Sequence, residues 1–238
     1  MLRLEEDRAV SVAPESIARN LAAVRARIAE AASRANRPSD SIRMVAVTKT
    51  VGVDEIRALV ALGVDDLGEN RVEMARPKIA ALESSAVHWH MIGAVQRRKA
   101  RDVVELFDTV DAVDRTELAD ALQQRCLEQD RRLSVLIEVN VSGEAQKHGF
   151  APDAVKTVLK HMASLDRLKV EGLMTMAPLG APEPELRRVF GGLRLLADRL
   201  ELPERSMGMS DDFEVAVEEG ATQVRIGTAL FIGAEAKN

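Results

Sequence analysis

Lys49 is the residue of this sequence whose setting most directly suggests chemistry. It ends the apolar run RMVAVTK (43–49), and Val45, Val47 and Lys49 share one face if this run is a strand. If that face lines a packed interior, desolvation lowers the pKa of the ammonium and frees the amine as a nucleophile. The alternative is that Lys49 leaves the strand and extends into solvent.

Arg225 is a second charged residue in an apolar setting, the run QVRIGTALF (223–231). On a strand, Gln223, Arg225 and Gly227 would share one face. A guanidinium is always charged, so an inward-facing one needs a partner. That partner is either a carboxylate of the protein, such as Glu138, or a bound ligand that offers a heteroaromatic nitrogen or a phosphate.

Two glycine-bearing segments, GMS (208–210) and GT (227–228), lie where the last two apolar runs end. Glycines let the backbone approach an anion, and a helix N-terminus offers free N–H groups. Ser210 is a candidate N-cap for a helix over 210–220, with a hydroxyl and an N–H to donate. Together with Lys49, these segments indicate a site for a phosphorylated aldehyde.

Eight apolar runs recur along the chain and predict eight strands separated by helices. The runs cover 43–49, 64–70, 87–93, 107–113, 134–142, 169–177, 205–210 and 223–231. Helical patterns cover 54–63, which ends at Gly63, and also 116–129 and 210–220, and an extra helix over 14–35 precedes the first strand.

This alternation predicts an α/β fold, a single (β/α)8 TIM-type barrel with an extra N-terminal helix, as one domain over residues 1–238. An open doubly wound sheet is the alternative. It usually carries a glycine-rich loop after its first strand, where this chain has TKTVGV.

The composition excludes several classes of protein. The chain has 238 residues, a formal net charge of −5, one cysteine and no tyrosine. The mild acidity argues against nucleic-acid binding, and no apolar run is long enough for a membrane span. The start of the chain lacks the pattern of a secretory signal, so we expect a cytoplasmic protein.

Three other features favour structural explanations. His88 and His90 lie on one strand face, but no third ligand is evident, so we expect no metal. Cys126 lies on an apolar helical stripe and is expected in the core. The basic cluster QRRKAR (96–101) is expected to be a solvated helix face.

Several segments in collinear order resemble the YggS/PROSC family of pyridoxal phosphate homeostasis proteins. These segments are VAVTKT, LGENRVEMARPKI, WHMIGAVQRRKAR, VNVSGEAQKHGF, EGLMTMAP and SMGMSDDFEVAVEEGATQVRIGTALFIG. The resemblance implies the barrel of the alanine racemase N-terminal domain and pyridoxal 5′-phosphate (PLP) as cofactor. The chain departs from the family pattern at Arg71 and at 96–99, which affects only inferences about the rim of the site.

The resemblance also assigns the candidate cofactor-binding residues. Lys49 would form the Schiff base, and Arg225 would face the pyridine nitrogen. The other implied contacts are Asn70 and His90 beside the pyridine ring, Ser210, Gly227 and Thr228 at the phosphate, and Ser206 and Met174 as further lining residues.

Two functions then remain, a PLP carrier without turnover and an amino-acid racemase. Racemisation needs a second acid/base group besides the lysine, and relatives supply a tyrosine from another domain, which this chain lacks. A cation such as Arg225 beside the pyridine nitrogen also weakens the ring as an electron sink. We therefore expect a monomeric carrier that hands PLP to apo PLP-dependent enzymes. A third alternative is a Schiff-base aldolase that acts on a sugar phosphate, and such an enzyme would purify without a bound chromophore.

Overall fold

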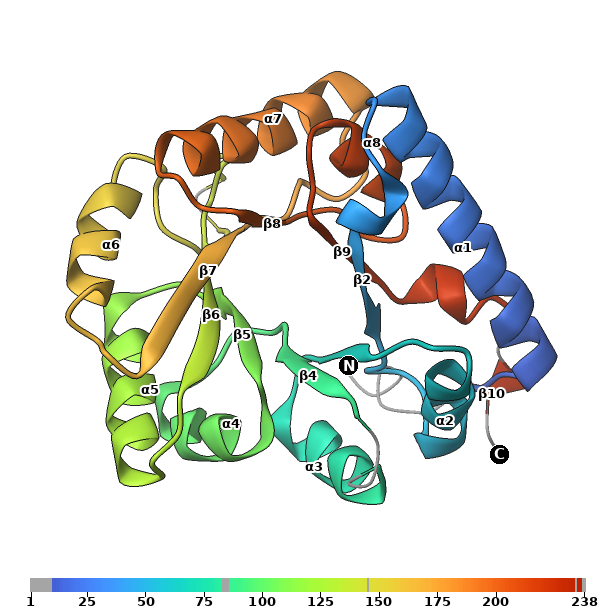
Figure 1. Cartoon of the computed structure of the whole chain (residues 1–238), viewed down its shortest axis with the longest axis horizontal. Coiled ribbons are helices and arrows are strands. Elements are labelled where there is room, and N and C mark those ends of the chain that lie inside the picture. The colour runs from blue at the N-terminus through green and yellow to red at the C-terminus, as the bar shows by residue number, and fades with distance from the viewer. Residues whose placement is uncertain (1–9, 83–85, 145, 234, 237–238) are drawn as a thin grey trace.

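Eight parallel strands form the centre of the molecule and close into a barrel (Figure 1). The computed structural model describes residues 10–82, 86–144, 146–233 and 235–236. In order around the barrel, the strands are β2 (Arg43–Val47), β3 (Asp66–Glu69), β4 (His88–Met91), β5 (Thr109–Val113), β6 (Leu133–Glu138), β7 (Leu168–Met174), β8 (Glu204–Ser206) and β9 (Gln223–Ile226). Strand β2 closes the barrel, because it pairs with both β3 and β9. The predicted (β/α)8 barrel is confirmed, and the open doubly wound sheet is excluded.

Helices cover the outside of this barrel (Figure 1). They are α1 (Pro14–Arg34), α2 (Val53–Ala61), α3 (Val72–Ala81), α4 (Ala100–Leu106), α5 (Thr116–Glu128), α6 (Val155–Met162), α7 (Glu183–Arg199) and α8 (Phe213–Glu218), with 3₁₀ turns η1 (Ser39–Ser41), η2 (Arg97–Lys99) and η3 (Thr228–Leu230). Outside the barrel, β1 (Val10–Ser11) pairs antiparallel with β10 (Glu235–Ala236).

The predicted N-terminal helix, α1, completes the ring of helices. It lies between α8 and α2 and also contacts η3, the turn that follows the last barrel strand (Figure 1). Its buried residues Ile17, Leu21, Val24 and Ile28 recur with the period of a helix that packs on one face. Helix α1 therefore takes the place of the helix that would follow the eighth strand of a regular barrel.

The interior of the barrel is unusually polar. A small apolar cluster of Ala112, Leu136 and Met174 lies apart from the main core between sheet and helices. Around it are buried polar side chains from several strands, namely His90, Asp111, Glu138, Ser206, Gln223 and Arg225. Buried polar groups are costly unless they are hydrogen-bonded, so this interior is built for specific contacts.

The helix ends test three predictions. Gly63 and Gly220 have φ values of +74° and +101°, as expected for residues that end helices in the left-handed region. The prediction that Ser210 caps a helix is wrong. Helix α8 begins at Phe213 after Asp212, and Asp212 Oδ1 accepts a hydrogen bond from the Met209 N–H. Ser210 instead contacts the segment that follows β9.

Two further predictions concern membrane-spanning helices and the single cysteine. Among the described residues, no helix has both the length and the apolar character needed to cross a bilayer. The lone cysteine, Cys126, is fully buried on α5, as expected, and burial raises the pKa of its thiol to about 11.

Candidate functional site

Lys49 lies in the turn that follows β2, at the carboxyl end of the barrel. Of the two alternatives for Lys49, the structure shows the solvent-exposed one, because the strand ends at Val47 and Lys49 lies beyond it. Val47 pairs with Gly68 on β3, and its Cβ lies 3.3 Å from where a Cβ on Gly227 would be. Lys49, two residues beyond Val47, therefore stands at the mouth next to the loop that begins at Gly227.

A buried cluster fixes the backbone just before Lys49. Lys78 of α3 donates to Glu69 Oε1 at 2.7 Å and to the Thr48 carbonyl at 2.8 Å. The Thr48 hydroxyl also donates to Glu69 Oε1, at 2.6 Å. All three side chains are buried, so the pair is hardly screened by water. This cluster orders the turn that carries Lys49.

Ser210 joins the two loops that were predicted to bind phosphate. Its Oγ accepts hydrogen bonds from the backbone N–H groups of Gly227, at 3.3 Å, and Ala229, at 3.2 Å. Thr228 lies between these two N–H groups and is exposed. The residues predicted to bind the phosphate, Ser210, Gly227 and Thr228, therefore lie together at this end of the barrel.

Gly208 is needed for the first of these loops. It has a φ of +95°, and a Cβ there would lie 2.6 Å from the Ala216 Cβ and 2.9 Å from the Phe213 Cα. Glycine is therefore required by both the backbone conformation and the packing of α8. This close approach brings the start of α8 under the loop that carries Ser210.

Arg225 is buried inside the barrel, as its position on the strand predicted. Its guanidinium donates to Ser206 Oγ at 2.7 Å and to the Thr175 carbonyl at 3.1 Å. Within the described residues it has no carboxylate within 4.0 Å, so the alternative of an ion pair with Glu138 is wrong. Burial lowers the pKa of Arg225, although Asp111 and other nearby carboxylates oppose that shift.

A chain of hydrogen bonds leads from Arg225 across the interior. Ser206 Oγ accepts a second bond from Gln223 Nε2, at 2.9 Å, and Gln223 also donates to Asp111 Oδ2 at 2.6 Å. Asp111 Oδ1 lies 3.0 Å from Nδ1 of His90. Because β9 and β5 are not neighbours, the contact between Gln223 and Asp111 spans the barrel.

His90 ends this network at the opposite side of the interior. Its Nε2 lies 3.1 Å from Asp66 Oδ1, so both ring nitrogens face carboxylates. Burial alone would lower the pKa of His90, but Asp111 and Asp66 outweigh it and raise the pKa to about 9. In this structure His90 therefore contacts Asp66 and Asp111, and its place beside the pyridine ring stays a prediction.

The remaining predicted residues lie at different depths. Asn70 follows β3 at the mouth, and the Asn70 carbonyl lies 2.5 Å from where a Cβ on Gly93 would be, so Gly93 permits this approach. A cavity of about 350 Å³ opens beside Asn70 and also contacts Arg71 and Arg98, two of the residues that depart from the family pattern. Met174 lies in the apolar cluster inside the barrel.

Sequence reasoning missed three residues that organise the site: Thr48, Lys78 and Asp111. The sequence held one indication of the role of Asp111, because it is an acidic residue within a strand whose other positions are all buried. Lys78 carried none, because lysines on amphipathic helices normally face solvent. Its role depends on contacts of α3 with β3 and with the turn after β2 that the sequence does not display.

Comparison with known proteins places this barrel in a class. The family described as the alanine racemase N-terminal domain matches residues 19–235. An alanine racemase from Clostridium difficile 630 has a TM-score of 0.73 at 15% identity, covering 96% of this chain and 59% of that chain. The barrel is therefore of the alanine racemase N-terminal type.

Closer relatives define the family within this class. The pyridoxal phosphate homeostasis proteins of Pseudomonas aeruginosa and Aquifex aeolicus are 42% and 40% identical, over 91% and 89% of this chain and 95% of each relative. PipY of Synechococcus elongatus PCC7942, solved with PLP bound, has a TM-score of 0.79 at 34% identity, over 90% of this chain and 99% of that chain. This chain belongs to the family of pyridoxal phosphate homeostasis proteins.

Proposed function

We propose that this protein binds PLP at the carboxyl end of the barrel and carries or buffers the cofactor without turning over a substrate. The observation that carries the proposal is that an exposed amine, Lys49, and the two loops joined by Ser210 lie at the same mouth of the barrel. The names of the relatives and the PLP in the PipY structure support the same ligand.

The donors at the mouth fit the parts of this cofactor. When bound, PLP supplies an aldehyde that condenses with a primary amine. Lys49 is the amine at the mouth, and the hydroxyls of Ser210 and Thr228, with the backbone at Gly227, would hold the phosphate. Asn70 stands at the same rim, where it would line the ring.

Arg225 favours a carrier over an enzyme. It would face the pyridine nitrogen, and Ser206 and the Thr175 carbonyl orient its guanidinium for that contact. A permanent cation keeps the ring nitrogen unprotonated, so the ring withdraws electrons weakly and carbanion chemistry is disfavoured. The chain has no tyrosine to serve as a second base for racemisation. Met174 and His90 would lie below the cofactor, as parts of the packed interior of the barrel.

The rest of the proposal concerns the setting of the protein. We propose that the whole chain works as one barrel, as a monomer in the cytoplasm, and that apo PLP-dependent enzymes receive the cofactor. The single cysteine and the mild negative charge support a reducing compartment without a nucleic-acid partner.

The test combines spectroscopy with mass spectrometry. The purified protein should be yellow, and borohydride reduction should fix the cofactor mass on the peptide that contains Lys49. A label found only on another lysine, such as Lys147 or Lys99, would refute the assignment. Solvent deuterium incorporation at Cα of alanine, followed by chiral analysis, should not exceed that with free PLP. Robust turnover would establish the racemase instead.

A further inference from the structure

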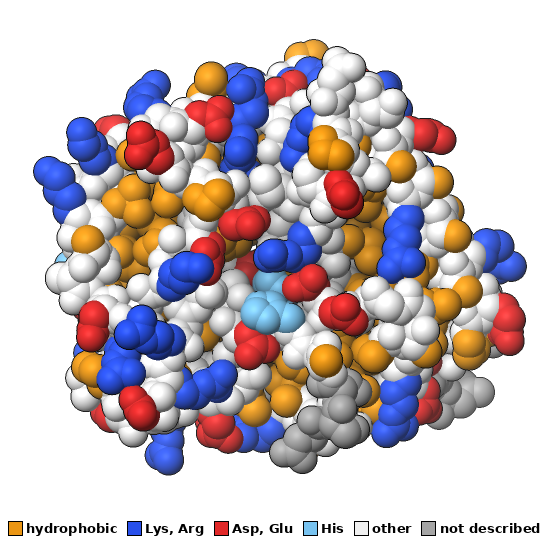
Figure 2. All heavy atoms as spheres, viewed as in Figure 1, with side chains coloured by type: hydrophobic (Ala, Val, Ile, Leu, Met, Phe, Trp, Pro, Cys, Tyr) orange, Lys and Arg blue, Asp and Glu red, His pale blue; other side chains and the backbone are white. Residues whose placement is uncertain are grey.

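A second hollow lies at the amino end of the barrel, opposite the mouth that carries Lys49. Its volume is about 520 Å³. Figure 2 shows histidine side chains at the centre of this face, surrounded by acidic and basic side chains. The lining residues with potential metal-binding or charged groups are Arg43, Asp65, Asp66, His88, Lys169, Glu171 and Glu204.

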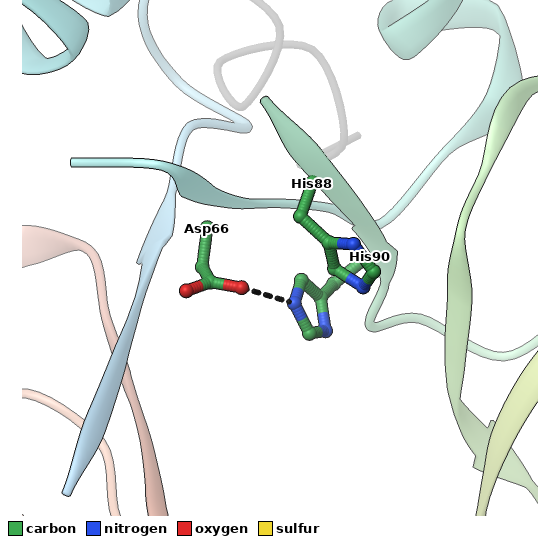
Figure 3. Close-up of side chains that lie close together, drawn as sticks. All are labelled: Asp66, His88 and His90. Atoms are coloured by element: carbon green, nitrogen blue, oxygen red, sulfur yellow. Dashed lines mark hydrogen bonds and ion pairs between the residues drawn. The ribbon is translucent and has the colours of Figure 1, made fainter. Parts of the chain in front are cut away.

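Three of the side chains in and under this hollow form a cluster with the donors of a metal site. Asp66 and His88 are register partners on β3 and β4, and His90 follows His88 on the same strand face. One donor atom from each residue lies within 4.8 Å of the others, and His90 Nε2 is 3.1 Å from Asp66 Oδ1 (Figure 3). Asp66 is thus the third ligand that the sequence alone did not reveal.

We propose that Asp66, His88 and His90 bind a divalent transition-metal ion of the zinc type at the amino end of the barrel. Two imidazoles and one carboxylate are a donor set that Zn²⁺ and Co²⁺ accept at about 2.0–2.2 Å. In a tetrahedral site such ligand atoms lie about 3.3 Å apart. The distance between His90 Nε2 and Asp66 Oδ1, 3.1 Å, is close to this spacing, and an ion bound there would displace the proton between these two atoms into solvent.

The surroundings of the cluster are those of an oriented metal site. Metal-binding histidines usually give their other nitrogen to a carboxylate or another acceptor, which fixes the ring. Asp111 holds Nδ1 of His90 in this way, and the Thr109 hydroxyl lies 2.8 Å from Nε2 of His88. Both partners belong to β5, so two rings on one strand are held from the neighbouring strand.

The Asp66 carboxylate keeps one oxygen for the proposed ion, and the fourth ligand position of that ion is open to solvent. Arg43 approaches Asp66 at 4.0 Å through Oδ2, while Oδ1 faces His90. Oδ1 therefore remains directed at the proposed ion. Because Asp66 and His88 both line the hollow, the fourth ligand would be water with access to solvent. A site with three protein ligands and an open position exchanges its ion more readily than a closed structural site.

The experiment uses the full chain with its cofactor, prepared without a polyhistidine tag, and Co²⁺ as the probe. We expect one equivalent of Co²⁺ to bind with d–d absorption at the red end of the visible spectrum, away from the cofactor, and Zn²⁺ to displace it. His88→Ala and Asp66→Asn should each weaken Co²⁺ binding at least tenfold. His90 itself is left unchanged, because the interior network depends on it.

Two controls separate this site from other sources of metal binding. His161 forms a surface pair with Asp120, with Nε2 and Oδ1 2.7 Å apart, and His161→Ala should leave the Co²⁺ affinity unchanged. Lys49→Ala, which would remove bound PLP, should also bind Co²⁺ normally, so a failure of the cofactor proposal would not affect this result. Absence of Co²⁺ binding overturns the inference. So does wild-type affinity in either folded variant of the cluster, or loss of binding in His161→Ala.

Discussion

Lys78 Nζ lies 2.7 Å from Glu69 Oε1, and both side chains are almost completely buried below the turn that carries Lys49. Breaking a buried ion pair from one side leaves an uncompensated charge, which costs about 3–5 kcal/mol. Lys78→Met should therefore lower the free energy of unfolding by about that amount, measured by urea denaturation. It should also disturb the absorption of the bound cofactor, because Lys78 holds the Thr48 carbonyl next to Lys49.

A matched control separates the ion pair from the general effect of removing a lysine. Lys160 is exposed on α6, and Lys160→Met should change the free energy of unfolding by less than about 0.5 kcal/mol. Equal effects of the two substitutions would show that the Lys78–Glu69 pair does not stabilise the fold.

Lys49→Ala should abolish the absorption band of the bound cofactor and leave the fold intact. Lys49 is exposed in a turn, so its truncation opens no cavity in the core. The melting temperature of the cofactor-free variant should match that of the cofactor-free wild type, as followed by circular dichroism. A large loss of thermal stability would instead assign Lys49 a structural role.

Arg225→Gln should weaken cofactor retention. The substitution removes a charge-assisted hydrogen bond to the ring nitrogen, a loss of about 1–3 kcal/mol, or roughly tenfold to a hundredfold in Kd. Gln223 would still hold Ser206, which limits the structural damage. Equilibrium dialysis against PLP measures the effect, and an unchanged Kd would remove Arg225 from the site.

Glu138 predicts a pH dependence of stability. Burial, reinforced by Asp114, raises the pKa of its carboxyl above the ordinary value of 4.5, so the folded protein binds a proton more tightly than the unfolded chain. The free energy of unfolding should therefore fall as the pH rises from about 4.5 through the raised pKa. Glu138→Gln should remove this part of the slope and stabilise the protein at neutral pH.

Urea denaturation across that pH range, on the wild type and the variant, measures this contribution. Glu117 lies exposed at the start of α5 and provides the control, since Glu117→Gln should preserve the slope. A wild-type slope retained in Glu138→Gln would show that another group is responsible.

The strands and the barrel were predictable because each strand is a short apolar run between polar helices. Strand β5 is buried at all five positions. The run that contains it can be recognised in the sequence without knowledge of its neighbours in space. The inward position of Arg225 was predictable for the same reason, since alternation along a strand is a local property.

The partners of the buried polar residues were not predictable, because they come from strands far apart in the sequence. Gln223 reaches Asp111 across the barrel, and Asp66 meets His90 from the neighbouring strand. The sequence left the exposure of Lys49 open, because that exposure depends on where the strand ends, two residues before the end of the apolar run. Ser210 failed as a cap because Asp212 begins the helix instead.

Because Cys126 is buried, the reactivity of its thiol measures local opening of the protein. The thiolate is the form that reacts with alkylating reagents, and a thiol with a pKa of about 11 behind α5 supplies almost none of it. Such reagents reach the sulfur only when α5 separates from the barrel wall. The rate of alkylation at Cys126 would therefore report how often α5 separates from the barrel. It would also show whether a ligand at either end of the barrel makes this local opening less frequent.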